Sequence, residues 1–485
     1  MSKSEESSYS VPLLPLAALL VAVAAFYLLT LRDGHNWGGD FAQYLYHAEN
    51  LANGRPYAQV DYVYNPLNNV VGPKAYPPVF PASLAPTLRL FGRNLLAVKI
   101  ELILFFLATI AVTSWLFSRD LSRNQLLLYA ALLGFSPALW QYKETILSEH
   151  LFLPLWYLAI LVADNWYRGR RILVSPVAHA VLLGVLIYLA CGTRSVAIVL
   201  LPSVLVMELV VTRRLTRFGC AAMATAVILI LVQKMLLPVA GQGYTEQLSQ
   251  IGFATLKRNI LANATSVGNL WENGYSMIVA MILTGVTSLV VAAAFCRRNW
   301  PRPTFLGVAT LLYLALIIIW PSATGLRLTL PLLPAVLFYV ILGLSDPIWN
   351  PTTQRRLLIG FAVLMTVNYL AWYNAADYGP IPGIEDPMAV ELFQYIEENT
   401  DPGDICLFFK PRVLAFFAHR PASAYPLVDD DTAFWDYVDS AGITVLIARK
   451  DATAPPESTV AQPADSRMIP EWENNQFRVV RLREQ

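Results

Sequence analysis

The chain has 485 residues, of which 56% are hydrophobic and only 14% are charged, and its mean hydropathy is +0.48. Soluble domains carry about 25% charged residues, so most of this chain cannot form an ordinary water-soluble globule. Its 35 basic and 34 acidic residues give a formal net charge of +1, which argues against a nucleic-acid partner. Apolar segments long enough to cross a bilayer indicate an α-helical polytopic membrane protein.

Eleven apolar stretches predict about eleven transmembrane helices. Every second connection between them is rich in arginine, as at Arg168, Arg170 and Arg171, which is the positive-inside pattern. We therefore expect a multi-pass protein of the cell (inner) membrane with a cytoplasmic N-terminus, a first helix that is retained, and an extracytoplasmic C-terminus. The apolar stretches are 11–31, 96–117, 126–141, 151–166, 177–193, 195–211, 218–237, 276–295, 304–320, 328–345 and 357–373.

Two domains are expected. Residues 1–373 form a transmembrane domain that includes a long first outer loop at 32–95, and residues 374–485 form an extracytoplasmic mixed α/β domain. A third outer loop, 238–275, is polar enough to fold over a site. In the tail we predict helices at 386–399 and 431–440, strands at 405–409, 443–448 and 477–482, and a mobile loop at 451–470.

Asp40 is the first candidate for chemistry. It follows Gly38-Gly39 and precedes a helix that Gly54 ends, in which Phe41 and Tyr44 recur at helical spacing. We expect this amphipathic helix to lie in the membrane interface. Asp40 is either the N-cap of the helix or an acidic group held at the bilayer surface beside a groove.

Lys74 and Tyr76 lie in a proline-rich segment that ends in Pro77-Pro78. This segment is either a rigid turn leading into the next helix or a path that presents Lys74 to an anionic group at the interface.

Glu149 and His150 stand at the mouth of an apolar helix. Placing a carboxylate at that position costs free energy, so Glu149 is a functional candidate. The position equally fits a snorkelling surface residue or a charge at the helix start that the helix dipole favours. With His35 and Asp40 these residues leave a divalent metal as an open alternative, which no ligand spacing supports. No cofactor is otherwise predicted.

Arg194 and Arg327 both break the positive-inside bias, since each lies on the outer side of the predicted membrane region. A guanidinium presents a fork of donors that suits phosphate oxygens. The alternative is that each forms a structural ion pair with an outer carboxylate.

Together these elements resemble the GT-C superfamily of membrane glycosyltransferases, and among them the branch of the protein O-mannosyltransferases and the lipid A aminoarabinose transferases. Two departures leave the sugar and the acceptor undefined: Phe41 stands where many relatives have the second acid of an Asp-Glu pair, and Tyr76 where aminoarabinose-type relatives have lysine. The resemblance is carried by Gly39-Asp40 with the helix from Tyr44 to Gly54, Tyr76-Pro77-Pro78, Ser148-Glu149-His150, Thr193-Arg194-Ser195, Arg327 to Pro334, and the α/β tail.

The resemblance implies an enzyme that transfers a hexosyl or pentosyl group from a polyprenyl-phosphate donor to an acceptor hydroxyl on the extracytoplasmic face, with inversion. The acceptor would be a lipid, a glycan or a protein, and the carrier would lie among membrane lipids. The implied site comprises Asp40 and Glu149 as catalytic residues, Arg327, Arg194 and Lys74 as ligands of the donor phosphate, and Tyr44, Tyr76 and His150 along the acceptor or sugar groove.

Three other functions stay open on the sequence. A polyprenyl-linked oligosaccharide polymerase or ligase would use the same carriers on the same side of the membrane. A polytopic transporter would carry charged or broken helices at mid-membrane depth, often with an inverted repeat. A receptor or assembly protein would use the tail to bind a partner.

Overall fold

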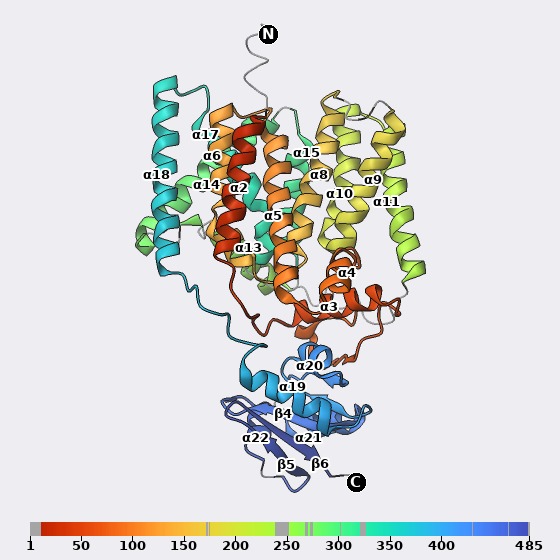
Figure 1. The fold of residues 1–485 in the computed structure, drawn as a ribbon. Coiled ribbons are helices and arrows are strands. Elements are labelled where there is room, and N and C mark those ends of the chain that lie inside the picture. The colour runs from red at the N-terminus through yellow and green to blue at the C-terminus, as the bar shows by residue number, and fades with distance from the viewer. Residues whose placement is uncertain are drawn as a thin grey trace.

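A computed structural model describes residues 11–170, 173, 175–237, 252–266, 270–271, 275–300, 302–320, 326–428, 430–463 and 465–483. A bundle of near-parallel helices forms one part of the molecule, and a smaller α/β unit is attached to one end of it (Figure 1). Of the loop expected at 238–275, residues 238–251, 267–269 and 272–274 lie outside the described residues. The part that is described includes α13 (Phe253–Ser266), where Asn259 donates to the carbonyls of Ile318 and Trp320.

A helix lies on each of the eleven expected apolar stretches. Within the described residues, seven helical segments are long and apolar enough to cross a membrane, so the polytopic prediction is confirmed at this coarser level. They are α5 (Leu95–Phe117), α9 (Pro176–Thr193), η3 to η4 (Ser195–Thr212, including α10, Leu200–Met207), α11 (Arg217–Leu236), α14 (Met277–Asn299), α16 to α17 (Arg327–Leu344) and α18 (Pro351–Ala375).

The other four stretches form helices that are shorter or, in α8, more polar. Crossing of the membrane by these four stays a prediction. They are α2 (Leu13–Leu29), α6 (Arg123–Gly134), α8 (Glu149–Tyr167) and α15 (Phe305–Ile318).

The first outer loop is more structured than predicted. It holds the expected helix, α3 (Gly39–Ala52), but also β1 (Tyr62–Val63), η2 (Asn69–Val71) and a second helix, α4 (Val79–Phe91). Most residues of α3 are buried, because α4 packs on one side of it and α20 (Pro411–Ala418) on another. The helix is therefore covered by protein on two sides, and its place in the membrane interface stays a prediction.

The C-terminal unit contains a six-stranded sheet in the order β1-β3-β2-β4-β6-β5. The strands β1, β3, β2 and β4 are parallel, whereas β6 pairs antiparallel with both β4 and β5. The further elements are β2 (Ile405–Leu407), β3 (Ala422–Ser423), β4 (Ile443–Arg449), β5 (Met468–Glu473), β6 (Phe477–Leu482), α19 (Pro387–Asn399), α21 (Asp431–Ser440) and α22 (Glu457–Ala461).

Local signals predicted most of this unit correctly. The helices α19 and α21 and the strands β2, β4 and β6 lie where the sequence placed them. The prediction of a loop over 451–470 was wrong, because residues 457–461 form α22 and β5 begins at Met468. No sequence pattern predicted α20, which is an eight-residue helix with a largely buried surface.

The first outer loop and the C-terminal unit share one sheet. The edge strand β1 comes from the loop, with Tyr62 in register with Ala422 and Val63 with Ser423. The chain after α18 is also tied to this loop, since the Ile381 N–H donates to the Asp33 carbonyl at 2.7 Å. These contacts fix the C-terminal unit against the end of the bundle where α3 and α4 lie (Figure 1).

The two ends of the bundle differ in charge. The arginine-rich connections, such as those that join α8 to α9 and α10 to α11, lie at the end opposite to the C-terminal unit (Figure 1). The segregation that the sequence predicted is therefore present in the fold. Which end faces the cytoplasm stays a prediction.

Candidate active site

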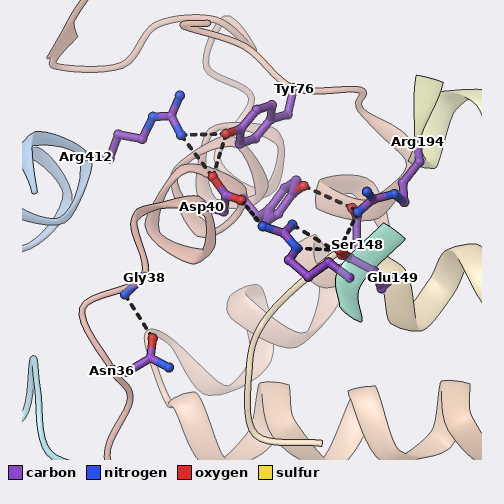
Figure 2. Close-up of polar contacts among 10 residues, drawn as sticks. Asn36, Gly38, Asp40, Tyr76, Ser148, Glu149, Arg194 and Arg412 are labelled. Carbon is purple, nitrogen blue, oxygen red and sulfur yellow. Dashed lines mark hydrogen bonds and ion pairs between the residues drawn. The ribbon is translucent and has the colours of Figure 1, made fainter. Parts of the chain in front are cut away.

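Six segments of the chain converge where the bundle meets the C-terminal unit, five of them labelled in Figure 2 and the sixth being α16 with Arg327. Figure 2 shows Asp40 of α3, Tyr76 of the first loop, Glu149 at the start of α8, Arg194 between α9 and η3, and Arg412 of α20. A cavity of about 530 Å³ lies beside this cluster, and Asp40, Arg327 of α16 and Arg412 line it. The α20 side of the cavity is formed by 409–412.

Asp40 does not cap its helix. The helix α3 begins at Gly39, its N-cap residue is Gly38, and no side chain caps it. The Oδ1 atom of Asp40 instead accepts hydrogen bonds from the Tyr76 hydroxyl at 2.7 Å and from Arg412 Nη1 at 3.2 Å, and Oδ2 accepts from Arg327 Nη1 at 2.8 Å. The carboxylate keeps 29% exposure on the cavity side, so the interpretation as an acidic group beside a groove fits and the cap interpretation was wrong.

The arginines control the protonation of Asp40. Burial by itself would raise the pKa of this carboxyl group, but the Arg327 and Arg412 guanidiniums and the Tyr76 hydroxyl outweigh it. Together they lower the pKa of Asp40 from 3.8 to about 2. Asp40 is therefore ionised at neutral pH.

Glu149 is a fully buried anion shared by two arginines. Its Oε1 atom accepts from Arg327 Nε and from Arg194 Nη1, both at 2.6 Å. Both outer arginines thus have the carboxylate partner that the ion-pair alternative predicted. The cluster nevertheless contains three guanidiniums, of Arg194, Arg327 and Arg412, against the carboxylates of Asp40 and Glu149. It therefore carries an excess of one positive charge, which would suit an added anion.

Tyr44 and Tyr76 belong to the same network. The Tyr44 hydroxyl lies 3.0 Å from Ser148 Oγ, which also accepts from Arg194 Nη1 at 3.3 Å. The rings of Tyr44 and Tyr76 pack with their centroids 5.0 Å apart. The two tyrosines therefore connect the Asp40 end of the cluster to the Arg194 end.

Two predicted site residues, His150 and Lys74, do not line the cavity beside Asp40. His150 is fully buried, and its Nδ1 and Nε2 atoms each lie 2.8 Å from a backbone carbonyl, of Leu147 and Tyr142 respectively. Lys74 offers its backbone carbonyl to the Gln43 amide, and Lys74 is not among the residues that line the cavity beside Asp40. This geometry gives neither residue a contact with the cavity.

The four residues considered as metal ligands are not arranged to hold a metal ion. They are His35, Asp40, Glu149 and His150. Arg327 bridges the carboxylates of Asp40 and Glu149, and His35 Nε2 accepts the N–H of Ile146. Among the residues that the structure describes, no three His, Cys, Asp or Glu side chains come close enough together to hold a metal ion.

Sequence reasoning missed Arg412. Its side chain is 2% exposed, and its guanidinium lies between the rings of Tyr62 and Tyr76, 5.0 and 4.9 Å from their centroids. The signal that could have found it is the pair of basic residues around Pro411 in a tail predicted to be extracytoplasmic. Arg194 and Arg327 were selected by the same criterion.

No family model and no curated protein matches the sequence. The fold, however, is similar to that of ArnT from Cupriavidus metallidurans bound to undecaprenyl phosphate, with a TM-score of 0.60 and 14% identity over 96% of this chain and 97% of that one. It is also similar to the archaeal oligosaccharyltransferase AglB from Archaeoglobus fulgidus in complex with an inhibitory peptide and a dolichol-phosphate, with a TM-score of 0.59 and 13% identity over 90% and 69% of the two chains. The apo form of the Archaeoglobus oligosaccharyltransferase gives a TM-score of 0.61 at 12% identity. These similarities confirm the predicted likeness to GT-C glycosyltransferases at the level of the fold.

Proposed function

We propose that this chain is a membrane glycosyltransferase that transfers a sugar from a polyprenyl-phosphate donor to an acceptor hydroxyl on the extracytoplasmic face, with inversion. One observation carries the proposal: an ionised carboxylate, Asp40, opens onto a cavity beside a guanidinium cluster with excess positive charge. The fold similarity to ArnT bound to undecaprenyl phosphate and to AglB supports it.

Arg327 and Arg194 are the proposed ligands of the donor phosphate. A phosphate group would balance the excess charge of the cluster and accept the bidentate hydrogen bonds that guanidinium favours. Thr329, two residues after Arg327, lines a second and largely apolar cavity of about 320 Å³ between α14, α15 and α17. An isoprenoid chain would find apolar surface there, close to its phosphate. Lys74 stays a proposed phosphate ligand.

Asp40 is the proposed base. The leaving group is a lipid phosphate and already a good anion, so the chemistry needs no strong acid. It needs cations that stabilise charge on that phosphate and a carboxylate that accepts the proton of the acceptor late in the reaction. Direct attack of the acceptor on the anomeric carbon, without a covalent enzyme intermediate, gives inversion. Glu149 is too engaged with Arg194 and Arg327 to act freely, so we assign it to positioning both arginines.

The likeness to an oligosaccharyltransferase favours one alternative, a polyprenyl-linked oligosaccharide polymerase or ligase. Both reactions would use the same carboxylate and arginines. They differ in the donor: one sugar on the carrier for the first function, and an oligosaccharide for the second.

Mass spectrometry of lipids that co-purify with the detergent-extracted chain tests the proposal. We expect a polyprenyl phosphate, and the mass of its sugar separates the two reactions. The same lipid should be depleted from Arg327→Ala but retained by Arg467→Gln, a control at a surface arginine that pairs with Asp465. If wild-type protein carries no polyprenyl phosphate and binds no added undecaprenyl phosphate, the proposed function is wrong.

A further inference from the structure

We propose that donor binding frees Asp40 for catalysis through an exchange of ion-pair partners. The donor phosphate takes Arg327 away from Asp40, while Arg412 of the C-terminal unit keeps the carboxylate in place. The inference rests on the proposed function. It assigns different tasks to the two arginines that contact Asp40, and it makes Arg412 a positioning residue.

The two oxygens of Asp40 are held in different ways. Arg412 and Tyr76 both bind Oδ1, at 3.2 and 2.7 Å. Oδ2 accepts from Arg327 Nη1 at 2.8 Å. A guanidinium bound to a carboxylate oxygen lowers its basicity, so Oδ2 becomes a better proton acceptor for an acceptor hydroxyl when Arg327 leaves it.

Arg327 is placed so that it can make this exchange. Its side chain is 26% exposed, lines the cavity, and has Glu149 as a second partner through Nε. If the contact with Glu149 is kept, a tilt of the planar guanidinium as one unit would move Nη1 from Asp40 toward a phosphate oxygen. Arg327 would thus exchange one anionic partner for another and would at no stage be a buried charge without a partner.

Arg412 is fixed. Tyr62 and Tyr76 hold its guanidinium between them, and its Nη2 atom donates to the Pro73 carbonyl at 3.0 Å. The backbone is close to it as well, because a Cβ atom on Gly72 would lie 3.2 Å from Nη2. With only 2% of its side chain exposed, Arg412 cannot follow Arg327 toward a ligand in the cavity.

The exchange would couple the two substrates. Before the donor binds, two guanidiniums keep Asp40 a weak base; afterwards one remains, and the carboxylate becomes more basic without moving. The acceptor would therefore be deprotonated only in the presence of donor. The charged and titratable groups that face Asp40 are Arg327 and Glu149 from the bundle, Arg412 and Lys410 at α20, and Tyr44 and Tyr76 from the first loop.

Binding of undecaprenyl phosphate to the full-length chain tests the exchange without any catalytic readout. If Asp40 competes with phosphate for Arg327, Asp40→Asn should bind undecaprenyl phosphate about tenfold more tightly than the wild type. In an Arg327→Ala background the same substitution should change the affinity by less than about twofold, because the guanidinium for which Asp40 and phosphate compete is absent. Equal affinity of Asp40→Asn and wild type would overturn the exchange.

The role of Arg412 is tested by the pH dependence of turnover. Arg412→Gln should bind undecaprenyl phosphate with an affinity within about threefold of wild type but lose about 10²-fold in kcat. The acidic limb of its kcat profile should move to higher pH, because a cation beside Asp40 has been removed. Arg412→Lys should keep the limb nearer its wild-type position but recover kcat only in part, because lysine lacks the planar fork. Arg467→Gln is the matched control and should change neither quantity.

The failures can be told apart. Absence of undecaprenyl phosphate binding by the wild type would defeat the proposed function itself. Normal binding and turnover, with an unshifted acidic limb in Arg412→Gln, would overturn the positioning role alone. The affinity of Asp40→Asn for undecaprenyl phosphate is measured without any Arg412 variant. It therefore tests the exchange even if Arg412→Gln does not fold.

Discussion

At the scale of single residues, the site depends on anions that keep buried arginines in place. Glu149 is the innermost of them, since it is fully buried and accepts from both Arg194 and Arg327. Removing one partner from a buried ion pair costs about 3–5 kcal/mol, because the remaining charge stays desolvated without compensation.

We therefore expect Glu149→Gln to lower the free energy of unfolding by about 3 kcal/mol or more. Added undecaprenyl phosphate should restore part of the loss by supplying a new anion to the two arginines. Thermal unfolding in detergent measures both effects. Glu49→Gln is the control, because Glu49 pairs with Arg55 and Arg93 at a partly exposed position, where ion pairs contribute about 1 kcal/mol or less. Equal loss in the two variants would contradict the shared-anion role.

Asp40→Asn should fold but lose about 10²-fold or more in turnover, because asparagine cannot accept the acceptor proton. Folding is expected to survive, since Glu149 still pairs with Arg327 and the helix α3 does not use Asp40 as a cap. Single-turnover transfer with donor already bound measures the effect. Near-normal turnover in well-folded protein would remove Asp40 as the base.

The stability that Asp40 contributes should depend on pH in a defined direction. The pKa of Asp40 falls from 3.8 to about 2 in the folded chain, so the ionised form is favoured by folding. This corresponds to about 2 kcal/mol, present above pH 4 and lost as the pH falls from about 4 to about 2. The difference in unfolding free energy between wild type and Asp40→Asn, followed by chemical denaturation, should shrink over that window. A difference that is constant with pH would show that the arginines do not hold the pKa down.

At the scale of elements, close packing of the membrane helices depends on small residues. A Cβ atom on Gly184 of α9 would lie 2.5 Å from the Ala222 carbonyl oxygen and 2.6 Å from Thr225 Cβ of α11. Glycine therefore lets these two helix backbones approach each other, as in many membrane helix pairs.

Gly184→Ala should force α9 and α11 apart and destabilise the fold by about 1–3 kcal/mol. Gly285→Ala in α14 is the matched control, because nothing lies within 4 Å of its added Cβ atom. It should be neutral or stabilising by up to about 1 kcal/mol, since alanine is the better helix former. Unfolding in detergent compares the two, and equal stability of both variants would contradict the close approach.

Prediction of the elements succeeded where the signal was local. Pro387 at the first turn marked α19, and a short run rich in Phe, Val and Leu marked β6 over 477–482. It failed for α20 and for β1, which is two residues long and is held by pairing with β3, some 360 positions further along the chain. A strand of that length has no pattern of its own.

At the scale of the whole molecule, the C-terminal unit and the first loop occupy the end of the bundle opposite to the arginine-rich connections (Figure 1). The positive-inside rule therefore predicts that the cavity lies on the extracytoplasmic side.

Single cysteines test this orientation in a variant without the four native cysteines. Cysteines at Ala376 and Ser466 should react with an impermeant thiol reagent in intact spheroplasts, whereas one at Arg214 should react only after lysis. Labelling in the reverse pattern would put the cavity on the cytoplasmic face and overturn the proposed use of an extracytoplasmic donor.

The sequence by itself determined the membrane class, the positions of the apolar helices, and six of the residues that meet in the cluster: Asp40, Glu149, Arg194, Arg327, Tyr44 and Tyr76. The length of an apolar stretch and the bias of arginine between loops can be read from short segments of sequence. Charged groups at the ends of apolar helices cost free energy, and this makes them recognisable as functional candidates. The tertiary structure alone decided what these groups do to one another, because the partners lie far apart in the chain.

Arg412 shows the difference most clearly. It contacts Asp40 across 372 positions, from a helix that the sequence did not reveal. The tertiary structure also turned His150 toward backbone carbonyls and kept Lys74 out of the cavity lining. Long-range packing selects which of the outer polar residues converge, and no spacing along the chain encodes that selection.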